Sequence, residues 1–129
     1  VKGTPDYEAS RCRNFAVNAH ARGYQPQYIA VCESVEDVQK CVQLAAAQNL
    51  TITVRTGGHN WFGCYLRDNV FLIDVGKLNQ LEIHSNNTAT VGPAVVGHEL
   101  NEVAAKRGLC FSAGHCVGVP LGGFLLGGG

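Results

Sequence analysis

The sequence predicts an α+β fold with a βαβ unit and a mixed sheet. A short apolar strand, an amphipathic helix and a second strand follow one another within about thirty residues, the pattern of two parallel strands joined by a right-handed crossover. Further along, a polar turn between two short strand-like runs predicts an antiparallel hairpin. The chain has 129 residues, of which 46% are hydrophobic and 16% charged, and this is sufficient for one domain with its own core.

An amphipathic helix is expected at the start of the chain. Thr4 is a helix-capping residue and Pro5 suits the first helical position, so we expect the helix to begin at Pro5 and to run unbroken to Ala21. Its inner face would carry the apolar residues that recur at helical spacing, namely Cys12, Phe15, Ala16 and Ala19. We interpret residues 1–24 as this helix and a lead-in to the domain that follows.

The βαβ unit and the later elements follow in order. Residues 28–32 predict a strand buried on both faces, residues 35–48 an amphipathic helix, and residues 51–55 a second strand. Ser34 and Asp37 are spaced as a capping box at the start of the helix. The remaining expected elements are a strand at residues 70–74, a hairpin of residues 81–84 and 88–92, and a helix from Gly97 to Arg107.

Glycine is concentrated in two segments that could hold a ligand. One is the loop after the second strand, at the carboxyl end where βαβ units gather their ligands. The other is the tail after Phe111, where apolar residues lie between the glycines. Such segments let backbone N–H groups approach a buried ligand while apolar side chains pack around it, which suits a phosphate-bearing cofactor with a flat ring.

Two short motifs in these segments carry reactive side chains. Gly57-Gly58-His59 has neither the spacing of a Rossmann turn nor that of a P-loop, so it is either a flavin or nucleotide loop or a turn with His59 facing solvent. In the tail, His115 and Cys116 are adjacent, and because neighbouring side chains point apart, any partner of Cys116 must come from elsewhere in space.

Charge, hydropathy and cysteine spacing exclude several classes of function. Ten Lys and Arg balance ten Asp and Glu, so no basic field is present for nucleic acid. No apolar run approaches the ~20 residues of a membrane span, and no zinc-ligand spacing occurs, so neither a membrane nor a metal partner is predicted. A disulfide between Cys64 and Cys110 is possible, but the spacing of the cysteines does not assign it. Three other cysteines lie on apolar stripes or strands and are expected in the core: Cys12, Cys32 and Cys41.

Three stretches together resemble one known family. They are Arg55-Thr56-Gly57-Gly58-His59-Asn60, then Leu72-Ile73-Asp74-Val75-Gly76-Lys77-Leu78-Asn79, and then Gly114-His115-Cys116 leading into residues 122–129. In this order they closely resemble the FAD-linked oxidases of the berberine-bridge-enzyme-like group, which belongs to the vanillyl-alcohol-oxidase superfamily. The resemblance implies that residues 25–129 form the amino-terminal part of a PCMH-type FAD-binding domain.

The resemblance further implies a flavin held by two covalent bonds. The imidazole of His59 would add to the 8-methyl carbon of the flavin, and the thiolate of Cys116 would add to its ring carbon 6. We expect Gly58 to tolerate no side chain, whereas Gly76 would belong to a turn outside the motif. The remaining implied cofactor-binding residues are Arg55, Thr56, Gly57 and Asn60 in the first loop, and Val117, Gly118, Gly122 and Gly123 in the second. The aromatic pair Trp61 and Phe62 would either wall the flavin or close the core.

The implied activity is that of an FAD-dependent oxidase. In the whole enzyme a base would take the proton of a small alcohol or sugar hydroxyl, the flavin would accept a hydride, and O2 would reoxidise it. The rest of the FAD domain, a substrate domain and the base are expected outside these 129 residues, so the chain alone would be inactive. A non-catalytic flavin-binding protein and a ligand-free structural α/β fragment are the alternatives.

Overall fold

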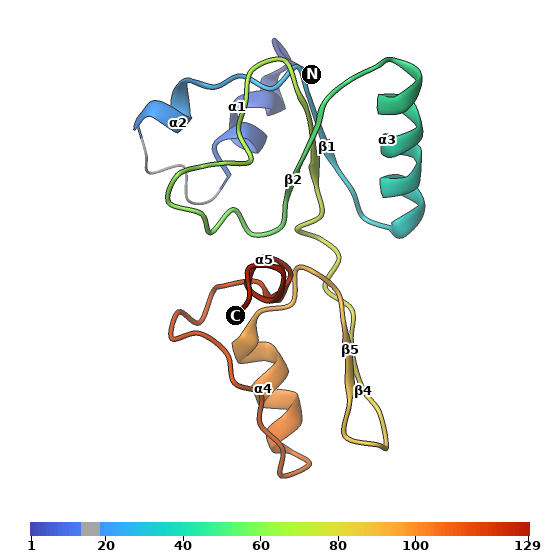
Figure 1. The fold of residues 1–129 in the computed structure, drawn as a ribbon, viewed down its shortest axis with the longest axis vertical. Helices are drawn as coiled ribbons and strands as arrows, with labels where there is room; N and C mark the ends of the chain where they lie inside the picture. The colour runs from blue at the N-terminus through green and yellow to red at the C-terminus, as the bar shows by residue number, and fades with distance from the viewer. Residues whose placement is uncertain (14–18) are drawn as a thin grey trace.

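The computed structural model describes residues 1–13 and 19–129, which form two parts joined end to end (Figure 1). The first part is built on a parallel sheet and the second on an antiparallel hairpin, so the predicted α+β class is confirmed. The expected mixed sheet is not found among the described residues, because the hairpin pairs only with itself and packs in the second part. The first part contains α1 (Pro5–Arg11), α2 (Ala19–Gly23), β1 (Tyr28–Val31), α3 (Val35–Ala47), β2 (Ile52–Arg55) and β3 (Phe71–Asp74). The second contains β4 (Leu81–Ile83), β5 (Ala89–Val91), α4 (Gly97–Ala105) and α5 (Leu121–Leu126).

The parallel sheet has β3 at its centre. The strand order is β1-β3-β2, so the two strands of the predicted βαβ unit are parallel as expected but have β3 between them. Phe71 and Ile73 pack in the cluster beneath α3, while Leu72 packs on the opposite face with Tyr65. Because side chains alternate along a strand, Asp74 lies on the same face as Leu72, away from α3.

The capping box and the strand positions are confirmed where the signal is local. Two other expectations are wrong: the Thr4 side chain makes no cap hydrogen bond at the start of α1, and β1 is half-buried or exposed instead of buried on both faces. Ser34 Oγ accepts a hydrogen bond from the Asp37 backbone N–H at 3.1 Å, and Asp37 Oδ2 accepts one from the Ser34 N–H at 3.2 Å. This capping box begins α3 at Val35. The expected hairpin also forms, with Leu81 opposite Val91 in an antiparallel pair.

The expectation of one unbroken helix from Pro5 to Ala21 is wrong. Helix α1 ends at Arg11, and α2 is a separate helix from Ala19 to Gly23; the expected core positions Phe15 and Ala16 lie outside the described residues. The carbonyls of Ser10, Arg11 and Arg13 accept hydrogen bonds from the Arg55 guanidinium at 2.6, 3.2 and 3.4 Å. A continued helix would need these carbonyls for its own ladder, so the tertiary contact ends α1. Cys12, expected inside, is exposed.

Helix α5 was not expected, because glycine is a poor helix former. The helix begins after Pro120 and forms because Leu121, 1% exposed, packs against Val95 and Leu100 in the core of the second part. Tertiary packing therefore outweighs local propensity here. Within the described part of the chain, no helix combines the length and apolar character that crossing a bilayer requires.

Candidate functional site

Two adjoining hollows lie where the first part meets the second. The main hollow has a volume of about 570 Å³, and the side hollow one of about 340 Å³. Both are lined by Thr56, His59 and Pro120. The first part contributes Arg13, Thr56, Gly57, His59 and Gly76 to the main hollow, and the second contributes Ala94, Val96, Cys116, Val117, Gly118 and Pro120.

The first loop leaves β2 and turns at once. Gly58 has φ +68°, in the left-handed region that favours glycine, and its carbonyl accepts a hydrogen bond from the buried Tyr65 hydroxyl at 3.4 Å. A Cβ on Gly57 would come 2.2 Å from Pro120 Cγ, so the two loops touch at this point. His59 is half-buried and follows directly, on the wall shared by the two hollows.

The second loop is fixed at its carboxyl end. Pro120 is buried and forms an isolated antiparallel bridge with Val96. The Leu121 N–H donates to the Val95 carbonyl at 2.7 Å, and the Gly122 N–H donates to the Pro93 carbonyl at 3.0 Å. Earlier in this loop Cys116, Val117 and Gly118 are exposed on the wall of the main hollow.

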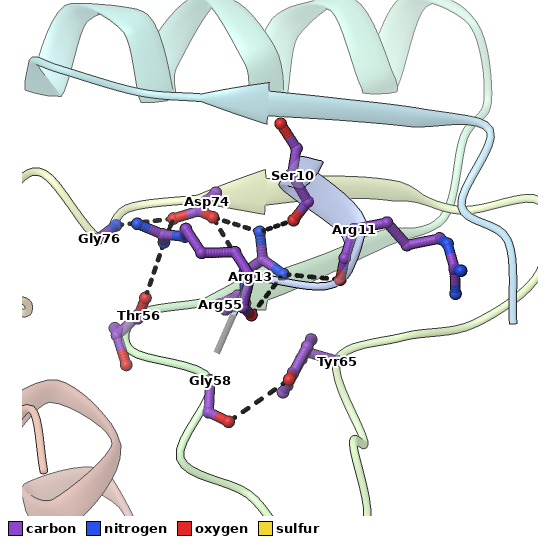
Figure 2. Close-up of polar contacts among 9 residues, drawn as sticks. All are labelled: Ser10, Arg11, Arg13, Arg55, Thr56, Gly58, Tyr65, Asp74 and Gly76. Carbon is purple, nitrogen blue, oxygen red and sulfur yellow. Dashed lines mark hydrogen bonds and ion pairs between the residues drawn. The ribbon is translucent and has the colours of Figure 1, made fainter. Parts of the chain in front are cut away.

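A buried carboxylate ties the first loop to the end of α1 (Figure 2). Asp74, the last residue of β3, is fully buried, and its Oδ2 accepts hydrogen bonds from Arg55 Nε at 2.9 Å and Nη2 at 2.5 Å. Its Oδ1 accepts one from the Gly76 N–H at 2.9 Å and another from Arg13 Nη2. Arg13 Nη2 also donates to the Thr56 carbonyl at 3.2 Å. The segments after β2 and β3 are therefore fixed to one charged centre.

The predicted site residues separate into three groups. His59 and Cys116, expected to hold the flavin, line the same hollow. With them on the main hollow are Thr56, Gly57, Val117 and Gly118. The side hollow is lined by Arg55, Gly58, Asn60 and Gly123. Gly122 lines neither hollow: its N–H donates to the Pro93 carbonyl, and a Cβ there would lie 2.8 Å from the Pro93 carbonyl oxygen.

Sequence reasoning missed several lining residues. Gly76, expected in a turn outside the motif, lines the main hollow, and a Cβ there would come 2.8 Å from the Thr56 carbonyl oxygen. Arg13 was not singled out at all. The available signal was Asp74, because a carboxylate at the end of an apolar strand is buried only when cations pair with it. The position of that cation along the chain has no local signature.

The aromatic pair and the other cysteines differ in how far they are exposed. Trp61 and Phe62 are 64% and 73% exposed, so they do not close the core of the described chain. Cys64 and Cys110 are exposed free thiols and form no disulfide in the structure. Cys32 is buried as expected, with Cys41 half-buried beside it and the two Sγ atoms 3.8 Å apart.

The walls offer backbone donors that suit an anionic, ring-bearing cofactor. Within residues 1–13 and 19–129, the backbone N–H groups of Gly58, Asn60, Val117 and Gly118 donate no hydrogen bond. Such N–H groups are costly to leave unpaired when a site closes, and phosphate or ring carbonyl oxygens satisfy them. The residues present therefore fit the flavin that the sequence motifs predict.

Known proteins are similar to this chain in both sequence and fold. FAD-linked oxidoreductase penO of Penicillium crustosum is 34% identical in an alignment 129 positions long, which covers 99% of this chain and 28% of penO. The crystal structure of 6-hydroxy-D-nicotine oxidase from Arthrobacter nicotinovorans aligns at 31% identity and a TM-score of 0.78, over 92% of this chain and 26% of that one. This chain thus spans about 28% of the length of penO.

A third similar protein is described with a particular flavin linkage. A glucooligosaccharide oxidase from Acremonium strictum, with a 6-S-cysteinyl, 8α-N1-histidyl FAD, aligns at 24% identity and a TM-score of 0.74. The alignment covers 81% of this chain and 22% of that one, and it shows a shared fold. Residues 26–129 match the family described as FAD binding domain. The resemblance predicted from the sequence is thereby confirmed: the chain belongs to the FAD binding domain family, and its relatives include proteins named FAD-linked oxidoreductases.

Proposed function

We propose that the intact protein is an FAD-dependent oxidase whose flavin is attached through His59 and Cys116. The observation that carries the proposal is that these two side chains, from loops far apart in the sequence, line one hollow of about 570 Å³. That volume lies in the range of small-molecule sites. The glucooligosaccharide oxidase carries its FAD on one cysteine and one histidine, the same pair of residue types.

The chain's own residues would bind and orient the cofactor. His59 offers a ring nitrogen and Cys116 an exposed sulfur, and both are nucleophiles suited to forming a bond with an electron-poor ring. The unused N–H groups of Gly58, Asn60, Val117 and Gly118 would donate to its oxygens. When bound, FAD supplies the hydride acceptor, which passes its electrons on to O2.

The proposed substrate is a small molecule with an alcohol or sugar hydroxyl. Two of the similar proteins are oxidases named for small molecules, one for 6-hydroxy-D-nicotine and one for glucooligosaccharide. We propose that the base and the substrate contacts come from polypeptide beyond this chain, which spans 28% of penO. The contribution of this chain is then anchoring of the cofactor and control of its electronics.

Acid denaturation of the intact protein tests the attachment. The yellow absorbance of the flavin should stay with the precipitated and washed polypeptide. His59→Ala and Cys116→Ala should each leave one bond, and the double variant should release all of its flavin. His115→Ala and Cys110→Ala are matched controls, because both residues are exposed and neither lines the described hollows. Their flavin should remain bound as in the wild type.

The outcomes separate the attachment from the activity. Release of all flavin from denatured wild-type protein would contradict covalent attachment, and a folded protein without flavin would contradict the proposed function. O2 consumption with a panel of sugars and alcohols tests oxidation. A flavin-loaded protein that consumes no O2 with any of them would support the alternative of non-catalytic flavin binding.

A further inference from the structure

A cation lies on the wall of the main hollow and has no part in the attachment just proposed. Arg13 lines this hollow beside Thr56 and Gly76, and its side chain is 32% exposed. Among the described residues that line the hollow, Arg13 alone has a permanent charge. The residue precedes the part of the chain that matches the FAD binding domain family, which starts at residue 26.

The charged cluster around Arg13 has an excess of one positive charge. Asp74 is paired with two guanidinium groups, those of Arg13 and Arg55, and both its side chain and that of Arg55 are 0% exposed. One carboxylate neutralises one of the two cations. Since Arg55 is sealed in the interior, the surplus charge faces outward at Arg13, on the hollow.

Arg13 has a donor left for a ligand. Its Nη2 is committed to Asp74 and to the Thr56 carbonyl. Its Nη1 donates no hydrogen bond within the described residues. Gly76, which also lines the hollow, lies directly against the guanidinium: a Cβ there would be 2.3 Å from Nη2 and 2.9 Å from Nη1.

We propose that Arg13 binds a phosphate oxygen of the flavin cofactor through Nη1. The inference rests on the proposed function. The backbone donors of the two loops would bind the cofactor, and Arg13 would add a charged contact from the segment that precedes the family match. A phosphate is the occupant that the charge favours, because the pyrophosphate of FAD is anionic whereas its oxidised ring is neutral. Hydrogen bonds between charged partners are also about twice as strong as neutral ones.

The test compares flavins with and without phosphate. The background is the intact protein with His59→Ala and Cys116→Ala, so that flavins bind reversibly, and fluorescence quenching gives the Kd of FAD and of riboflavin. Arg13→Gln should weaken FAD binding about ten-fold or more and change riboflavin binding by less than about two-fold. Arg13→Lys should restore part of the FAD affinity. Arg107→Gln, at an exposed arginine outside the hollow, should change neither Kd.

Each outcome decides the inference. An equal loss of FAD and riboflavin affinity in Arg13→Gln would overturn it, because holding Asp74 and Thr56 in place is then the whole role of Arg13. If Arg13→Gln fails to fold, Arg13→Lys decides: a lowered ratio of FAD to riboflavin affinity supports the phosphate contact, and an unchanged ratio overturns it. A wild-type protein that binds no flavin at all refutes the proposed function, and the inference falls with it. FAD binding with an unchanged ratio in both variants refutes only the inference.

Discussion

The two loops that line the main hollow are held in different ways. The loop after β2 leaves a strand whose last residue, Arg55, is 1% exposed and bonded to the fully buried Asp74. The loop before α5 is anchored differently: at its start the Asn101 side chain bonds to the backbone N–H and carbonyl of Phe111, and at its end Leu121 packs in the core, while Val117 between them is 69% exposed. One wall of the site is therefore fixed by buried charge, and the other by neutral hydrogen bonds and apolar packing at its two ends.

This difference indicates separate roles for the two loops. A buried ion pair is costly to desolvate, but once formed it specifies one arrangement of the groups around it. The first loop is thus ready for a ligand before the ligand arrives. The second loop, with exposed residues at Cys116 and Val117, would gain order from the ligand that it covers.

The largest expected effect is from removal of the buried carboxylate. Asp74→Asn leaves the guanidinium of Arg55 buried without its counter-charge, so the free energy of unfolding should fall by about 3–5 kcal/mol. Urea denaturation of the intact protein measures it. Glu82→Gln, at an exposed carboxylate on β4, is the control and should change it by less than about 0.5 kcal/mol. A loss below about 1 kcal/mol for Asp74→Asn would show that buried charge does not hold the first loop.

The next effect concerns two glycines with the same backbone angle. Gly58 in the first loop and Gly108 after α4 both have φ +68°, so alanine at either should cost about 1–2 kcal/mol of stability. At Gly108 a Cβ meets nothing within 4 Å, whereas at Gly58 it would lie 3.1 Å from the Tyr65 hydroxyl. Gly58→Ala should therefore also lower the flavin bound per folded molecule, while Gly108→Ala should not. Thermal unfolding measures the stability, and absorbance measures the flavin bound per folded molecule. Equal flavin content in both variants would show that Gly58 is not part of the flavin site.

Local patterns in the sequence predicted much of the fold, and long-range contacts account for what they missed. The capping box of Ser34 and Asp37 is contained in four residues, so a local reading finds it. Helix α1 ends where it does because Arg55 donates hydrogen bonds to the carbonyls of Ser10 and Arg11, which lie more than forty positions earlier in the chain. A contact over that separation leaves no local pattern in the sequence. The same holds for α5, where burial of Leu121 overrides the low helix propensity of glycine.

The candidate site follows the same division. His59 and Cys116 were found because each lies in a motif of a known family, and the structure adds that they share a hollow. Arg13 was missed because its importance comes from its contact with Asp74, at the end of a different element. The unexpected part of the site is thus the part built by contacts between distant residues.

A smaller effect is expected in the exchange of backbone amides. If the second loop gains order from the cofactor, the amides of Val117 and Gly118 should exchange rapidly in flavin-free protein and slow on loading, by roughly ten-fold or more. The amide of Val75 donates to the Arg55 carbonyl at 2.8 Å and should exchange slowly in both states. Hydrogen–deuterium exchange with mass spectrometry measures the peptides. Equal protection of both loops before loading would mean that the second loop is as rigid as the first.

The smallest effect distinguishes thiols in the two regions. Burial, reinforced by the neighbouring Cys41, raises the pKa of the Cys32 thiol from 9.0 to about 12, whereas Cys116 is exposed on the second loop. Alkylation of flavin-free protein at pH 8 should therefore modify Cys116 quickly and Cys32 only after unfolding.

The same raised pKa makes stability depend on pH. A folded-state pKa above the unfolded value stabilises the fold at low pH, so the stability due to Cys32 is fully present below pH 9 and is lost as the pH rises toward about 12. The free energy of unfolding should fall over this window, and less steeply in Cys32→Ala. Mass spectrometry of the alkylated peptides measures the first effect and urea denaturation at each pH the second; rapid labelling of Cys32 in the native protein would show that the sheet beneath α3 opens as readily as the second loop.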